Sequence, residues 1–298
     1  MPNLAGMEDI RQMITGQIHK IVGAGSKAID LDMPAGDPGL FGPKSASWKV
    51  HGDFNSMMIG GLTALLLQML HPAALAGVWD HSNFRADRLG RLRRTAQFIA
   101  ATTYGSTAEA ERLIARVRRI HDHVTGTTAD GQPYAANDPA LLTWVHAAET
   151  SSFMRAYLRY RDPSFSAADQ DRYFAETATV AIKLGAGDVP LTRAGIEAYL
   201  LEMRPQLLAD ARSTDVARTL LSGEAPSLAL APFGSLVRHA AVDLLPDWAA
   251  AMHGLRVPSL RRPGVRIGAM AAGSVLRWAL RDNSRSRAQR RVVATPHA

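Results

Sequence analysis

The sequence predicts an all-α protein, with a single helical domain over residues 1–255 and a basic C-terminal extension over residues 256–298. Apolar residues recur at three- and four-residue spacing through most of the chain, and runs of alternating β pattern are scarce. Capping residues and glycines mark the ends of these periodic segments, and no repeat or clean linker appears before residue 255. The 298 residues, 47% hydrophobic and 20% charged, suffice to bury one large core together with a cofactor.

The individual helices are predicted from their caps. Ser106 to Glu109 read as a capping box that opens a helix running to Val124, where Gly126 stops it. Asp138 and Pro139 supply a cap and a first-turn proline for a later helix. The predicted helices lie at about 10–22, 56–71, 88–103, 107–124, 139–160, 167–184, 193–204, 213–222, 232–244, 246–254 and 265–281.

The net charge of +7 is concentrated in the extension. From Arg256 onward there are ten arginines and one acid, so the extension carries +9 and residues 1–255 carry −2. With no helix-turn-helix pattern, this distribution does not indicate a nucleic-acid partner. Arginines beside Ile267 and Met270 instead predict peripheral contact with an anionic membrane. The alternative is a helix packed on the domain, followed by a solvated, disordered arginine end.

Nothing near the start of the chain has the basic and apolar pattern of a signal peptide, so we expect a cytoplasmic protein. Residues 57–79 lack charge and are long enough to span a membrane. We interpret them as a buried core helix, because polar and helix-breaking residues interrupt them: Gly60, Gly61, Gln68, His71 and Pro72.

Several kinds of site are excluded by composition. With no cysteine, the chain cannot form disulfides, iron–sulfur clusters or a thiolate haem ligand. The paired Glu-x-x-His motifs of di-iron bundles, phosphate-binding loops and the Gly-x-Ser-x-Gly nucleophile elbow are also missing.

His121 is the histidine best placed to enter an apolar interior. It follows Val117 by four residues on a stripe that also contains Leu113, Ile114 and Ile120, whereas His123 falls on the arginine-rich face. A lone histidine on an apolar face is more often a hydrogen-bonded core residue than a metal ligand, and position alone leaves both readings open.

Arg91 and Thr95 are four residues apart, beside an apolar stripe that includes Leu92 and Ile99. An arginine and a hydroxyl in this place suit haem propionates or a bound oxygen species. A salt bridge at the rim and a threonine bonded to its own helix are the structural alternative.

The order and spacing of several motifs resemble the catalytic domain shared by rubber oxygenase (latex-clearing protein) and the MpaB oxygenase. The motifs are SWKVHGD (47–53), LLLQMLHPAALAGVWDHSNF (65–84), RLRRT (91–95), YG (104–105), IHDHVTG (120–126), YAANDPALLTWVHA (134–147) and DRYFAE (171–176). The resemblance implies a helical domain that encloses a b-type haem, with His121 as axial ligand of the iron and with Arg91 and Thr95 near the haem. In the rubber-cleaving branch a lysine precedes the threonine, and here that position is Arg94, a very poor iron ligand.

The role of two further groups stays open. His71 either lines the haem pocket or holds the end of the apolar helix by bonding a free carbonyl. The family's carboxylate base has Asp80 and Glu149 as candidates, and His146 lies on the same helix face as Glu149. His51 and His81 read as polar loop residues.

The sequence therefore predicts a haem-b-dependent oxygenase that oxidises or cleaves a hydrophobic, isoprenoid or lipid-like substrate with dioxygen. The alternative is a non-catalytic haem- or lipid-binding protein of the same fold. Oxygen consumption that depends on a substrate would separate the two.

Overall fold

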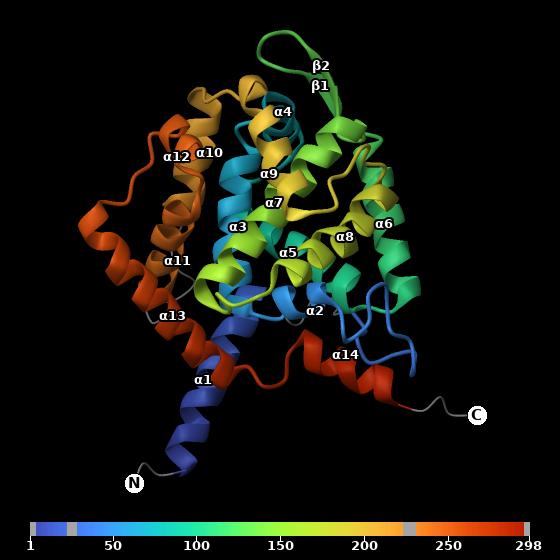
Figure 1. The fold of residues 1–298 in the computed structure, drawn as a ribbon, viewed down its shortest axis with the longest axis vertical. Helices are drawn as coiled ribbons and strands as arrows, with labels where there is room; N and C mark the ends of the chain where they lie inside the picture. Colours follow the sequence, from blue (N-terminus) through green and yellow to red (C-terminus); the bar gives the residue numbers. More distant parts are fainter. Residues whose placement is uncertain (1–3, 23–28, 223–230, 295–298) are drawn as a thin grey trace.

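The computed structural model describes residues 4–22, 29–222 and 231–294, which form a helical protein with one small β-hairpin (Figure 1). The prediction of an all-α fold is confirmed. The elements are α1 (Leu4–Val22), α2 (Ala46–His51), α3 (Phe54–Gln68), α4 (Pro72–His81), α5 (Arg88–Tyr104), α6 (Thr107–His121), β1 (Thr125–Thr127), β2 (Pro133–Ala135), α7 (Pro139–Tyr160), α8 (Ala167–Leu184), α9 (Arg193–Glu202), the 3-10 turn Arg204–Gln206, α10 (Ala211–Leu221), α11 (Ala231–Leu244), α12 (Asp247–Met252), the 3-10 turn Ser259–Arg261, α13 (Arg262–Ala279) and α14 (Ser284–Val293).

Most predicted caps form as the sequence indicates. The side chains of Ser106 and Asp138, and that of Ser166 before α8, each accept a hydrogen bond from the backbone three residues later. The predicted capping box is only half formed, because the side chain of Glu109 pairs with Arg112 instead. The cap of α3 is Asp53, so this helix begins at Phe54, two residues before the predicted start at residue 56.

Helix α7 runs through the middle of the molecule and is buried along most of its length (Figure 1). It packs against α3 on one side and α8 on another. Gly60 allows the close approach of α3, because a Cβ atom there would lie 2.9 Å from the backbone oxygen of Ser152. A glycine that interrupts the apolar run in the sequence is thus a contact point between two core helices.

The prediction for the end of α6 is wrong. This helix ends at His121 and not at Val124, and Gly126 belongs to strand β1. Strands β1 and β2 pair antiparallel, with Thr125 opposite Ala135, and project from one end of the molecule (Figure 1). The chain leaves the helix three residues early because it enters this hairpin.

The C-terminal segment packs against the rest of the chain. Helix α13 lies against α1, α3 and α11, and α14 lies against α5. Arg262 and Arg266 pair with the buried carboxylate of Asp243, and Arg277 pairs with Asp53. Part of the positive charge of residues 256–298 is therefore neutralised within the molecule.

Arg291 of α14 is buried, with 1% of its surface exposed. Its guanidinium donates to four backbone oxygens, those of Leu31, Asp37, Tyr104 and Gly105, at 2.8–3.1 Å. These contacts join the loop after α1 to the turn between α5 and α6. A buried cation of this kind is stabilised only when nearly all its donors are satisfied.

No single helix among the described residues is long and apolar enough to cross a membrane. Helices α3 and α4 meet that composition only as a pair, and they are bent by 104° at the break between them.

Candidate functional site

Helices α5 and α6 are joined by two residues and pack against each other, so they form an αα-hairpin. Arg91 and Thr95 lie near the start of α5, and His121 is the last residue of α6. These residues therefore lie toward the same, open end of the hairpin. No hydrogen bond, ion pair or ring contact within the described part of the chain joins His121 to Arg91 or Thr95.

His121 is half-buried and His123 is exposed, as expected, although His123 lies in the turn after α6 and not on a face of the helix. The Nδ1 atom of His121 is buried and has no hydrogen-bonding partner. Burial lowers the pKa of His121, and the nearby amide of Asn137 and the charge of Asp122 partly oppose that effect. A neutral imidazole is the form that binds a metal.

Arg91 is half-buried and donates from Nη1 to the hydroxyl of Ser82 at 2.8 Å. Burial lowers its pKa. It borders a small apolar cavity lined also by Leu65, Met69, Val78, Phe84, Leu92, Val216 and Leu220. A partly desolvated guanidinium beside apolar walls suits a carboxylate of an otherwise apolar ligand.

Two further residues of the RLRRT motif, Arg94 and Thr95, face solvent. Arg94 pairs with Asp87, the cap of α5, at 3.1 Å, and both side chains are at least half exposed. Thr95 is exposed as well. The rim salt bridge considered for Arg91 is thus formed by Arg94.

His71 caps α4. Its Nδ1 accepts a hydrogen bond from the backbone N–H of Ala73 at 3.2 Å, and its ring lies 5.9 Å from that of Trp144. Burial lowers its pKa. Of the two roles considered, His71 has the structural one in this fold. It holds the start of α4 by accepting a backbone N–H of that helix, and not by bonding a free carbonyl at the end of α3.

The first two-thirds of α5 is loosely covered by the rest of the protein. Every residue from 89 to 100 is half-buried or exposed, although Leu92 and Ile99 are apolar, and every residue from 101 to 106 is buried. At the open end of the hairpin, Leu89 is 38% and Ile120 is 51% exposed. The prediction that both belong to a buried stripe is wrong, and an apolar surface flanks His121 instead.

A cluster of buried polar residues includes Thr103, which lies near the closed end of the hairpin, and the sequence did not reveal this cluster. His51 is not a loop residue: its Nδ1 contacts the hydroxyl of Thr103 at 2.8 Å, and its Nε2 contacts that of Tyr173 at 3.0 Å. Burial lowers the pKa of His51 to about 3. Thr103 and Tyr173 come from α5 and α8, so only the folded chain brings the three together.

Glu149 of α7 lies close enough to Tyr173 to raise the pKa of that phenol, together with burial. Burial raises the pKa of Glu149 itself to about 7. His146, one turn earlier, has its Nε2 buried without a partner, and burial lowers its pKa to about 4. Asp80, the other candidate base, is exposed and accepts a hydrogen bond from the hydroxyl of Tyr134 at 2.8 Å, which ties the β-hairpin to α4.

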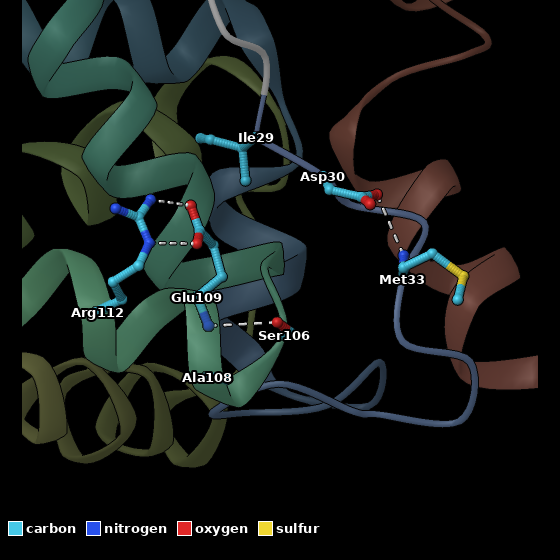
Figure 2. Close-up of a pocket in the computed structure, with 7 residues that line it drawn as sticks. All are labelled: Ile29, Asp30, Met33, Ser106, Ala108, Glu109 and Arg112. Carbon is cyan, nitrogen blue, oxygen red and sulfur yellow. Dashed lines mark hydrogen bonds and ion pairs between the residues drawn. The ribbon is translucent and has the colours of Figure 1, made fainter.

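A larger surface pocket of about 450 Å³ lies at the opposite end of α6 from His121. Figure 2 shows that Glu109 and Arg112 pair with each other there, at 2.7–2.8 Å. Asp30 accepts from the backbone of Met33, and Ser106 accepts from that of Glu109. Because its polar groups already have partners, we do not consider this pocket the functional site.

The described residues contain no group of three or more histidines and acids placed to hold a metal ion. A site that rests on one axial histidine needs no such group. The structure is thus a helical fold in which α6 ends on a half-buried histidine.

The family model of the catalytic domain of the ER-bound oxygenases mpaB/B′ and rubber oxygenase matches residues 48–278. The chain belongs to this family, and the resemblance seen in its motifs is confirmed. The match extends beyond residue 255 to include most of α13. Comparisons with curated proteins and with solved structures give no significant match.

Proposed function

We propose that the protein is a haem-b-dependent oxygenase that oxidises or cleaves a hydrophobic, isoprenoid or lipid-like substrate with dioxygen. Family membership supports an oxidoreductase of the oxygenase type. The observation that carries the haem assignment is His121, whose ring is half-buried at the open end of the α5–α6 hairpin beside an apolar surface.

The residues at this end fit a haem in chemical terms. His121 supplies a neutral imidazole for axial ligation. Arg91 is a half-buried cation that suits a propionate, and Leu92 and Ile99 offer an apolar wall to a porphyrin. Thr95 and Arg94 lie on the same helix, where the exposed hydroxyl is available to a ligand that covers this face and the guanidinium pairs with Asp87.

When bound, the haem iron supplies the redox chemistry with dioxygen. The chain's own part would be to hold the haem through His121, to exclude water with apolar side chains, and to accept or donate protons. Glu149, with its pKa near 7, is the group best suited to accept a proton at neutral pH. Its neighbour Tyr173 joins it to His51 and Thr103 in a buried polar cluster.

Absorption spectra of the haem-reconstituted protein test the assignment. We expect stoichiometric haem binding, and we expect His121→Ala to lose haem or to change its spectrum strongly. His123→Ala, on the exposed face two residues away, is the matched control and should leave the spectrum unchanged. Wild-type spectra from both variants would show that His121 is not the ligand.

Oxygen uptake with isoprenoid and lipid alkenes separates the oxygenase from a non-catalytic carrier of the same fold. Uptake that requires both haem and substrate supports the oxygenase. Haem binding without any such uptake across these substrates favours the carrier.

We also propose that the protein is cytoplasmic and meets an anionic membrane at the surface formed by α1 and α13. These helices are in contact, and they expose Ile10, Met13, Ile267 and Met270. Arg256, Arg261 and Arg281 are exposed on the C-terminal segment. Membrane contact would suit an enzyme that collects a lipid-soluble substrate.

A further inference from the structure

The side-chain amide of Asn137 is held over the last turn of α6. Its Nδ2 donates to the backbone oxygen of Arg118 at 3.2 Å and to Oδ1 of Asp122 at 2.5 Å. Arg118 and Asp122 lie three residues before and one residue after His121. The amide is therefore fixed beside the turn that carries His121.

The orientation of this amide is determined by its partners. An amide turned the other way would place its oxygen against two oxygen atoms, neither of which can donate a hydrogen bond when Asp122 is ionised. Nδ2 must therefore point to Arg118 and Asp122, and Oδ1 points away from them.

Two buried polar atoms at this place lack partners, namely Asn137 Oδ1 and His121 Nδ1. A buried polar atom without a partner costs about 1–3 kcal/mol. One atom is an acceptor, and the other becomes a donor when it carries the imidazole proton. The amide is also near enough to His121 to affect its pKa, which agrees with this placement.

The β-hairpin brings Asn137 to this position. Thr125 pairs with Ala135, and the backbone N–H of Ala136 donates to the oxygen of Val124 at 2.9 Å. The register of the two strands thus returns the chain to the end of α6 just before α7 begins. The hairpin that shortens α6 also supplies the residue that contacts it.

We propose that Asn137 is the positioning residue for His121: its Oδ1 accepts the Nδ1 proton and holds the imidazole in the tautomer whose Nε2 lone pair is free for iron. The role of Nε2 rests on the proposed haem function, whereas the tautomer is a property of the haem-free chain. Acceptors at the second ring nitrogen of a ligating histidine fix ring orientation and increase its basicity.

The first experiment uses the full chain without haem. Two-bond ¹H–¹⁵N NMR correlations report which nitrogen of each histidine is protonated. We expect His121 to be the Nδ1–H tautomer in the wild type and to lose this preference in Asn137→Leu. Asn83→Leu, at an exposed asparagine, is the matched control. A wild-type His121 protonated at Nε2, or an unchanged tautomer in Asn137→Leu, would overturn the proposal.

The second experiment uses the haem-loaded protein. Asn137→Leu should weaken haem binding about tenfold or more and should raise the reduction potential. An unchanged reduction potential in Asn137→Leu would refute the acceptor role. If neither the wild type nor the variants bind haem, the proposed function is wrong, but the result on the His121 tautomer still stands.

Discussion

Glu149 should make the folded protein less stable as the pH rises toward neutrality. Burial raises the pKa of its carboxyl from 4.5 to about 7, so the folded state binds this proton more tightly than the unfolded chain does. The stability that the protonated carboxyl contributes is complete below pH 4.5 and is lost as the pH rises through 7. At about 1.4 kcal/mol per pH unit, the loss amounts to about 3 kcal/mol.

Glu149→Gln removes this titration while keeping the size and shape of the side chain. Urea unfolding of the variant and the wild type at pH 4.5 and pH 8 gives the difference in unfolding free energy at each pH. The variant should gain about 3 kcal/mol relative to the wild type between the two pH values. Comparison in the same buffer cancels the opposite trend from His51 and His146, whose lowered pKa values cost stability as the pH falls below 6.5.

Glu202→Gln, at an exposed glutamate, is the control and should show a difference that does not change with pH. A Glu149→Gln difference that stays constant within about 0.5 kcal/mol from pH 4.5 to 8 would refute the reasoning. That result would mean that water reaches the carboxyl and keeps its pKa in the ordinary range.

Three further predictions concern the scaffold and the surface. Arg291→Met leaves four buried carbonyls without their donor and should cost at least about 3 kcal/mol of unfolding free energy. Arg290→Met removes only an exposed ion pair and should cost less than about 0.5 kcal/mol. Equal losses of unfolding free energy in urea would contradict the role of Arg291. His51→Ala should cost about 2–4 kcal/mol, because it leaves two buried hydroxyls unpaired, and thermal unfolding that matches the wild type would show that they find other partners. Serine at both Ile267 and Met270 should reduce sedimentation with anionic vesicles at low salt, and a wild type that does not sediment with them would exclude membrane attachment.

The sequence predicted those features that depend on neighbours a few residues away. The caps at Ser106, Asp138 and Ser166 formed because each bonds within its own first turn. His121 was assigned correctly to the more buried side of α6 for the same reason, whereas His123 lies in the turn after the helix. The family assignment succeeded because motifs that are weak alone keep a specific order.

Features that depend on distant partners were missed. The polar role of His51 requires Tyr173, which is 122 residues away, and α2 alone gives no sign of it. The β-hairpin was missed because each strand has only three residues, too few for a detectable alternation. Ile120 continues the helical apolar pattern, yet it is exposed. Its exposure was missed because the pattern does not show which part of a helix other elements will cover.

The buried contacts of Arg291 also have a consequence for the order in which the molecule is completed during synthesis. A ribosome makes the chain from the N-terminus, so the four carbonyls near residues 31, 37, 104 and 105 emerge long before the arginine that binds them. Until residue 291 is added, the turn that begins the His121 helix lacks its internal cation and must rely on water. Completion of the α5–α6 turn is therefore tied to the last helix of the fold, and a nascent chain that stalls before α14 would carry this turn without its buried cation.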